Sequence, residues 1–159
     1  MDLGNGSWLE PAVSVEAKLG RKVMIYAPVN IYGWPTIGDY TKIGAFTEIG
    51  PNVKIGMRCR IQRGVFIPEG VSLGDDVFVG PNVTFTNVKK PEAMRDVKRY
   101  DQTYVGDRVI IGANSTILPG ITIGNDVFIG AGSVVTKSIA NNLMVYGNPA
   151  TRRKFLNAV

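Results

Sequence analysis

Residues 36–50 read TIGDYTKIGAFTEIG, and within them Ile37, Ile43 and Ile49 lie six positions apart, each followed by glycine. The same spacing extends towards both ends of the chain without a miss over thirteen positions, and it resumes over six more after one interruption. The nineteen apolar positions are Val13, Leu19, Ile25, Ile31, Ile37, Ile43, Ile49, Ile55, Ile61, Ile67, Leu73, Val79, Phe85, Val105, Ile111, Ile117, Ile123, Ile129 and Val135. A strict short period of this kind is typical of a solenoid. The spacing therefore predicts that the chain winds into regular coils.

Each hexad predicts one short strand and one bend, so three hexads make one triangular coil. Glycine usually follows the apolar position because the corners bring backbones close together. Coils stack at the spacing of paired strands, roughly 4.8 Å, which gives about six triangular turns and a prism on the order of 30 Å tall. We expect the apolar column to fill the interior, together with Cys59, which shares the phase of Val53 and Val65 and is interpreted as a core residue. The predicted fold class is all-β, a parallel β-helix of hexapeptide repeats.

The period slips once, between Phe85 and Val105, where fourteen extra residues enter the chain. An insertion in a solenoid leaves as an external loop, and such loops commonly carry binding function. We expect an extruded loop over 86–104, although its polar composition also fits a solvated loop without a role. The predicted domain organisation is an N-terminal cap over 1–12, a β-helix over 13–140 with this loop, and a C-terminal cap over 141–159 with a short helix that begins near Pro149.

Composition narrows the function classes. The 159-residue chain carries a net charge of +5, and the basic excess is concentrated in 89–99 and 152–154. Basic and aromatic residues do not alternate along one face, so we expect no nucleic-acid partner, whereas small polyanionic ligands fit. No apolar run approaches the ~20 residues that cross a bilayer, and the N-terminus lacks the features of a signal peptide; we expect no membrane partner and a cytoplasmic location. The chain has no histidine, which excludes imidazole mechanisms, and we expect no metal site.

Stacking arithmetic places candidate site residues without a structure. Residues eighteen apart on uninterrupted coils lie above one another, so Asn87 is expected to stack near Glu69, with Arg63 one hexad earlier. An amide, a carboxylate and a guanidinium would then gather near the base of the loop. Asn87 fits equally well as a turn residue that satisfies its own backbone.

Several stretches resemble a known family: 66–71 (FIPEGV), 79–87 (VGPNVTFTN), 111–124 (IGANSTILPGITIG), 130–137 (GAGSVVTK) and 147–150 (GNPA). With the hexad repeat, they are similar to the left-handed β-helix acyltransferases of the hexapeptide-repeat superfamily. Within it they resemble the nucleotide-sugar N-acetyltransferases, in particular those acting on UDP- or dTDP-linked 3-amino sugars. Left-handedness is an implication of this resemblance.

The resemblance implies a homotrimer in which acetyl-CoA lies between neighbouring prisms and a nucleotide sugar lies under the extruded loop. Asn87 would lie beside the acceptor amine, with Glu69 as the second catalytic residue. The implied cofactor-binding residues are Ala113, Ala131, Lys137, Asn148, Pro149 and Arg152, and the implied substrate-binding residues are Gln62, Arg63 and Asn82.

The chain departs from this branch at two places, Arg63-Gly64 in place of Ser-His and Val88 in place of Asp. A guanidinium at 63 suits a sugar carboxylate or a phosphate.

The missing histidine favours N- over O-acylation. A sugar hydroxyl needs a base during attack, whereas an amine with a pKa of about 7.7–8.0 is partly neutral at pH 7. Positioning and stabilisation of the oxyanion then carry most of the catalysis. Asn87 would orient the amine and Glu69 would receive its proton. Together with the resemblance, this argument predicts an acetyl-CoA-dependent N-acetyltransferase that acts on a nucleotide-linked amino sugar. The resemblance alone implies a role in surface-polysaccharide precursor synthesis. The alternative is a non-catalytic β-helix, an assembly or carbohydrate-binding module, which would not bind acetyl-CoA.

Overall fold

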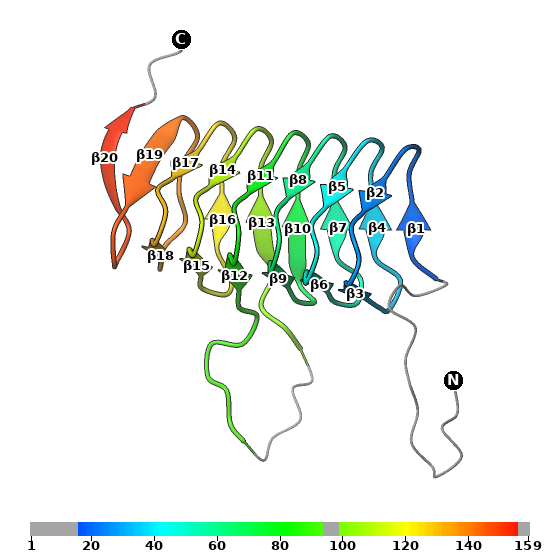
Figure 1. Cartoon of the computed structure of the whole chain (residues 1–159). Helices are drawn as coiled ribbons and strands as arrows, with labels where there is room; N and C mark the ends of the chain where they lie inside the picture. The colour runs from blue at the N-terminus through cyan, green and yellow to red at the C-terminus, as the bar shows by residue number, and fades with distance from the viewer. Residues whose placement is uncertain (1–15, 94–98, 156–159) are drawn as a thin grey trace.

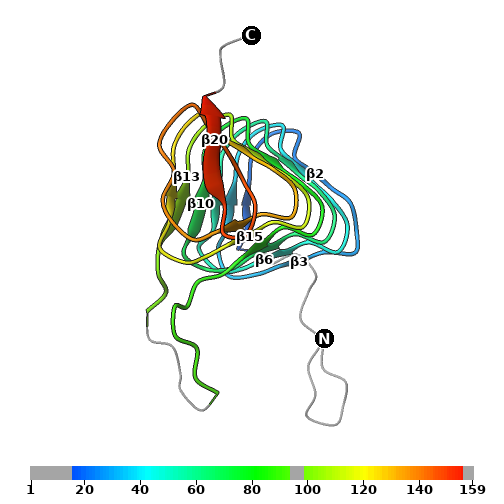
Figure 2. The ribbon, with the colours of Figure 1, turned by 90° about the vertical axis from the view of Figure 1, so that its left-hand side faces the viewer.

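The computed structural model describes residues 16–93 and 99–155, and the side chains among them up to residue 152. These residues form a prism with three flat sides, seen along its length in Figure 1 and from one end in Figure 2. Each side is a sheet in which strands from successive coils lie next to one another. No helix occurs among the described residues, and none of them forms a helix long and apolar enough to cross a membrane.

We number the faces in chain order. Face 1 consists of β1 (Lys18–Leu19), β4 (Thr36–Ile37), β7 (Lys54–Ile55), β10 (Val71–Leu73), β13 (Thr103–Val105) and β16 (Thr122–Ile123). Face 2 consists of β2 (Met24–Ile25), β5 (Lys42–Ile43), β8 (Arg60–Ile61), β11 (Phe78–Val79), β14 (Ile110–Ile111), β17 (Phe128–Ile129), β19 (Leu143–Tyr146) and β20 (Thr151–Phe155). Face 3 consists of β3 (Asn30–Ile31), β6 (Glu48–Ile49), β9 (Phe66–Ile67), β12 (Thr84–Phe85), β15 (Thr116–Ile117) and β18 (Val134–Val135). Corners 1/2, 2/3 and 3/1 are the bends between these faces.

The strand register confirms the eighteen-residue coil. Thr36 pairs with Lys54 on face 1, and all strands except β20 pair in parallel. Across the interruption, Thr84 pairs with Thr116, fourteen positions more than a regular coil. The fold is therefore the predicted all-β left-handed parallel β-helix of hexapeptide repeats, and β19 adds a further strand to face 2 beyond six coils.

The apolar column fills the interior as predicted. Ile37, Ile49 and Ile67 have no exposed surface, and Phe85 is the largest fully buried side chain. Leu19, on the first described strand, is an exception and is 45% exposed.

Cys59 is a core residue. Its side chain is buried and its thiol donates to the carbonyl of Gly74 at 3.1 Å. Burial raises the pKa of the Cys59 thiol to about 11, so the thiolate is scarce at neutral pH.

The extruded loop leaves from corner 3/1, between β12 and β13, and projects from the prism in both views (Figures 1 and 2). β13 begins at Thr103, inside the range expected for the loop, so the segment between the two strands is 86–102. Thr103 is buried, and its hydroxyl accepts the Gly120 N–H at 3.1 Å. This contact joins the returning chain to the next coil.

The predicted C-terminal helix is wrong. Residues 147–150 form a turn, and β20 returns antiparallel to β19, with Tyr146 opposite Thr151. A last parallel strand presents a row of unpaired backbone groups, and a returning strand supplies partners for them. Pro149 lies in this turn instead of starting a helix. The predicted N-terminal cap over 1–12 lies outside the described residues.

Corner 1/2 carries stacked ion pairs. Arg58 donates to both carboxylate oxygens of Asp76, each at 2.7 Å, and Arg108 donates in the same way to Asp126, at 2.7 and 2.8 Å. The hydrogen bonds from each arginine hold the pKa of its partner carboxyl below the usual range. Although exposed pairs are usually weak, two-point arginine bonds have the geometry that gives them most effect.

We expect Arg58→Gln to lower the thermal unfolding midpoint at pH 7 and to lose most of this effect at pH 3. The folded-state pKa of Asp76 lies below its unfolded value of about 3.9. The pair therefore stabilises the fold above that value, and its contribution is lost as the pH falls through the folded-state pKa. Thermal unfolding of wild type and variant between pH 7 and 3 measures this. Lys54→Gln, which removes one charge from exposed β7, should show no such pH dependence. If Arg58→Gln lowered the unfolding midpoint equally at pH 7 and pH 3, the ion pair with Asp76 would not be the cause of its effect.

Candidate functional site

Asn87 lies above Glu69 at corner 3/1, where the loop begins, because β9 and β12 pair in register. The Asn87 Nδ2 donates to the main-chain carbonyl of Glu69 at 3.0 Å. The main-chain carbonyl of Asn87 accepts the N–H of Asp101, also at 3.0 Å. Asn87 thus fastens the start of the loop to the coil below and to the end of the loop. Its Oδ1 remains the atom that can accept a hydrogen bond from a ligand amine.

The surroundings of Glu69 are acidic and aromatic. Asn52 Nδ2 donates to the Glu69 carboxylate at 3.2 Å, and the Tyr32 hydroxyl donates to Glu48 at 3.1 Å. The pKa of Tyr32 is raised above its usual value. Burial is the largest cause, followed by the charge of Glu48, the hydrogen bond to Glu48, and the charges of Tyr100 and Glu69. These four acidic groups therefore lie close enough to influence one another. Each carboxylate is held by a neutral donor, so both keep the capacity to accept a proton or a ligand hydrogen bond.

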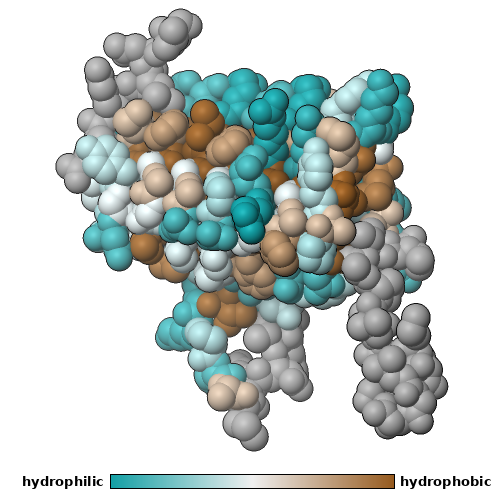
Figure 3. Space-filling model, viewed as in Figure 1, coloured by the Kyte–Doolittle hydropathy of each residue, from teal (hydrophilic) through white to brown (hydrophobic). Residues whose placement is uncertain are grey.

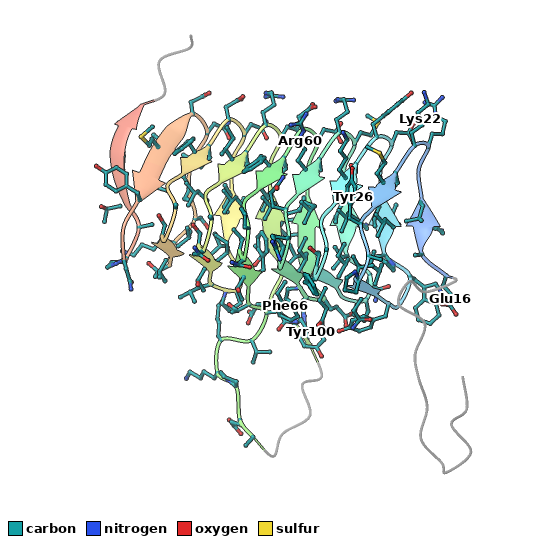
Figure 4. All side chains as sticks on the ribbon, in the orientation of Figure 1. Glu16, Lys22, Tyr26, Arg60, Phe66 and Tyr100 are labelled. Carbon is teal, nitrogen blue, oxygen red and sulfur yellow. The ribbon has the colours of Figure 1, made fainter. Side chains whose placement is uncertain are left out.

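A hollow lies at the returning end of the loop beside this group. It has a volume of about 360 Å³ and is lined by Arg99, Tyr100, Asp101 and Gln102. Lys89, in the part of the loop that leaves the prism, forms an ion pair with Asp101 at 3.4 Å. Figure 4 shows Tyr100 and Phe66 at the base of the loop. The hollow is open, and its lining offers charged and polar groups together with apolar surface, so it suits a sugar, which has hydroxyl groups and apolar ring faces.

Sequence reasoning missed Tyr32, Glu48 and Tyr100. Eighteen-residue stacking could have found Glu48, because it lies opposite Phe66 on the neighbouring strand of face 3. Tyr100 is brought here by the path of the loop, which has no counterpart in the period.

Arg63 does not join Asn87 and Glu69, and the expected gathering of the three is wrong. One hexad spans a whole face, so Arg63 lies at corner 2/3, across face 3 from Glu69. Its guanidinium lies over the ring of Phe46, with 5.8 Å between its central carbon and the ring centroid. Arg63 is exposed, so its charge is available to an anionic ligand at that corner.

Corner 2/3 collects most of the other predicted residues. Gln62 and Arg63 follow β8, Asn82 follows β11, Ala113 follows β14 and Ala131 follows β17. Asn82 adopts a positive φ of 57° and its N–H donates to the Arg63 carbonyl at 3.0 Å. Glycine precedes both alanines because the coils nearly touch here: a Cβ on Gly80 would lie 2.6 Å from the nitrogen of Ala113. Ala113 and Ala131, with the glycines before them, therefore form a strip of small residues along corner 2/3, which we call the alanine strip.

The main-chain N–H of Ala113 has no hydrogen-bond partner among the described residues, whereas those of Gln62 and Asn82 at the same corner are bonded. At corner 1/2 the equivalent N–H is taken by the next coil: Asp75 donates to the Asp107 side chain at 2.9 Å, and Asp107 donates to the Asn125 side chain at 2.8 Å. At corner 2/3 the residue above Ala113 is Ala131, whose side chain has no oxygen to accept. The half-buried Ala113 N–H is therefore placed to polarise a carbonyl.

The turn 147–150 lies over the end of the same strip. Gly147 N–H donates to the Ser133 hydroxyl at 3.3 Å, the Gly147 carbonyl accepts the Val134 N–H at 2.9 Å, and Ala150 donates to the Val134 carbonyl at 2.8 Å. These bonds hold Asn148 and Pro149 at corner 2/3, where both are exposed.

Two predicted cofactor residues lie elsewhere. Lys137 follows β18 at corner 3/1, the corner of Asn87, and is exposed. Arg152 lies on β20 opposite Val145. Lys137 is thus separated from the alanine strip by the width of face 3. The described residues contain no group of three potential ligands that could hold a metal ion.

Residues 35–69 and 102–137 match the bacterial transferase hexapeptide family, described by six repeats. A galactoside O-acetyltransferase of Lactococcus lactis is 35% identical over 82 residues, which are 49% of this chain and 40% of that protein. A dTDP-3-amino-3,6-dideoxy-alpha-D-galactopyranose 3-N-acetyltransferase of Aneurinibacillus thermoaerophilus is 47% identical over 51 residues, 32% of this chain and 27% of that protein. The chain thus matches less than half the length of each of these relatives.

Among solved structures, a mutant of AntD, an N-acyltransferase from Bacillus cereus in complex with dTDP and coenzyme A, shares the fold. The two structures superimpose with a TM-score of 0.72 and share 23% sequence identity. The superposition covers 87% of this chain and 83% of the AntD chain. The Aneurinibacillus relative confirms the resemblance to nucleotide-sugar N-acetyltransferases. The matched segments lie on both sides of the loop and cover less than half of the 159-residue chain, which is thus similar to this family over its repeats.

Proposed function

We propose that this protein transfers an acetyl group from acetyl-CoA to the amino group of a nucleotide-linked amino sugar, with UDP- or dTDP-linked 3-amino sugars favoured. The observation that carries the proposal is Asn87 stacked on Glu69 at the base of the loop, in a transferase repeat fold without histidine. Two similar proteins support the proposal: one is named as the N-acetyltransferase of a dTDP-linked 3-amino sugar, and a structure of the same fold contains dTDP and coenzyme A.

The mechanism needs only an amine. Oδ1 of Asn87 would accept a hydrogen bond from the sugar amine and aim its lone pair at the thioester carbonyl carbon. Attack forms the C–N bond and moves the carbonyl electron pair onto the oxygen. The amine proton passes to Glu69 directly or through water, the C=O bond then re-forms as the C–S bond breaks, and the thiolate of coenzyme A is protonated. A main-chain N–H, such as that of Ala113, would stabilise the oxyanion.

The two halves of this site lie on different corners of one prism. Asn87, Glu69 and Lys137 are at corner 3/1, whereas Ala113, Ala131 and the turn 147–150 are at corner 2/3. This separation favours a site completed by a second subunit, with the loop corner of one prism facing the alanine strip of its neighbour. We therefore propose a homotrimer, with acetyl-CoA in the groove between prisms, and cytoplasmic synthesis of surface-polysaccharide precursors as the setting.

A thiol-release assay tests the function. Acetyl-CoA is supplied with UDP- and dTDP-linked 3-amino and 4-amino sugars, and each is matched by the same nucleotide sugar with a hydroxyl in place of the amine. We expect release with one amine and none with its hydroxyl counterpart. Release with the hydroxyl would favour O-acetylation, the activity named for the Lactococcus relative. Absence of turnover together with absence of acetyl-CoA binding by calorimetry would favour the non-catalytic β-helix.

A further inference from the structure

A second hollow lies on face 2, on the first three coils and away from the loop. It has a volume of about 280 Å³ and is lined by Tyr26, Lys42, Gly44, Arg60, Ile61 and Gln62. Figure 4 shows Tyr26 and Arg60 on this side of the prism, two coils apart. In the space-filling view, hydrophilic side chains lie between apolar areas over the middle coils (Figure 3). None of the proposed roles in acetyl transfer uses Tyr26, Lys42 or Arg60.

Two like charges are stacked in this hollow. Lys42 on β5 lies directly opposite Arg60 on β8 in the parallel register, and both side chains are exposed. Directly opposed like charges on neighbouring strands are destabilising. The outward positions on either side of the pair, Met24 and Phe78, supply no counter-charge.

The arginines at corner 1/2 have carboxylate partners, unlike Arg60. Arg21, Arg58 and Arg108 each form an ion pair with an aspartate of the next coil, at 2.7–2.8 Å. Within the described residues, no carboxylate lies within ion-pair distance of Lys42 or Arg60. An anion between the two cations would remove their repulsion and bind both of them.

The other residues that line the hollow indicate which class of anionic ligand it fits. Tyr26, Gly44 and Gln62 occupy equivalent positions on three successive coils, one residue after Ile25, Ile43 and Ile61. The missing side chain at Gly44 leaves a gap between Tyr26, which is 54% exposed, and the half-buried Gln62. Two cations suit linked phosphates, and an exposed ring beside them suits a base or a sugar. A single inorganic ion would leave the ring unused.

We propose that this hollow binds the diphosphate of a nucleotide, with Lys42 and Arg60 on the phosphates and Tyr26 against the nucleoside. The inference rests on the proposed function, in which the acceptor sugar is carried by a nucleoside diphosphate and coenzyme A carries a diphosphate of its own.

The test is calorimetric titration of the full chain with UDP, dTDP, coenzyme A and inorganic phosphate, at fixed salt and pH 7. The variants are Lys42→Gln and Arg60→Gln. The matched control is Lys54→Gln, which removes the same charge from an exposed outward position of β7 on face 1. We expect each pocket variant to weaken one of the diphosphate ligands at least tenfold, and the control to change it less than twofold. The weakened ligand identifies the source of the diphosphate.

Three results would overturn the assignment. Unchanged affinity for all nucleotides in both pocket variants would remove the pocket from ligand binding. An equal loss of affinity in Lys54→Gln would show that the change in net charge, not the pocket, causes the effect. A change in solution mass in the pocket variants would make the hollow a contact with a second copy. If wild type turns over amino sugars while the pocket variants bind nucleotides normally, only this inference fails; if wild type binds no nucleotide, the proposed function fails with it.

Discussion

Phe85→Ala is expected to lower the free energy of unfolding by about 3–5 kcal/mol, the usual cost of truncating a fully buried aromatic ring. Phe85 has no exposed surface and is the largest of the fully buried side chains. It stands in the interior column opposite Ile117, on the last strand before the loop. The loop lies between this coil and the next along the chain, so the ring fills the core at the point where the two coils are joined by the long loop. Denaturant unfolding followed by circular dichroism measures the loss.

The matched control for this prediction is Phe128→Ala. Phe128 is an outward residue on β17 and is only partly buried, so its truncation leaves no interior cavity and should cost clearly less. Equal losses for the two variants would show that the column at Phe85 does not contribute as a closed core. Because solenoids can unfold repeat by repeat, two separate transitions in Phe85→Ala alone would place the break at this coil.

Asn87→Ala is expected to lower turnover at least tenfold while the prism stays folded. The alanine cannot accept a hydrogen bond from the acceptor amine, and it also loses the 3.0 Å bond to the Glu69 carbonyl that fastens the loop. A tenfold loss corresponds to about 1.4 kcal/mol of transition-state stabilisation. Steady-state kinetics with the amino sugar found by the thiol-release assay measures it, with solution mass and the unfolding midpoint recorded beside it.

Asn87→Asp separates the two roles of this side chain. It keeps an oxygen acceptor for the amine and loses the Nδ2 donor, so a structural role predicts losses as large as in Asn87→Ala, and an orienting role predicts partial rescue. Asn142→Ala, at exposed corner 1/2, is the control and should leave turnover unchanged. An unchanged rate in Asn87→Ala would remove this residue from the mechanism.

The stacking of Asn87 on Glu69 could be predicted because it depends only on counting eighteen residues along a coil. The position of Arg63 could not be predicted by the same argument. One hexad moves a residue to the next corner, and the distance across a face is set by the shape of the triangle. The cluster of Tyr32, Glu48 and Tyr100 depends in part on the path of the loop, for which the hexad period gives no rule.

The C-terminus is a second place where the sequence did not predict the structure. Asn148-Pro149-Ala150 has the local signals of a helix start, and local signals were all that the sequence offered there. In the folded chain, β19 leaves an open strand edge, and pairing with β20 satisfies it. Similarly, the chemistry of Lys42 and Arg60 is visible in the sequence only as two basic residues. Their repulsion follows from the parallel register that places them opposite one another.

The six-residue period is enough to predict the coil, its interior and the point where the loop leaves, because it makes every residue the neighbour of those one coil away. Which corner each polar side chain occupies, how the last strand is covered and which cations meet without a carboxylate follow from the folded chain. Burial repeats identically on all three faces and therefore appears in the sequence as a period, whereas charge, hydrogen bonding and open edges depend on how the three faces close around one another.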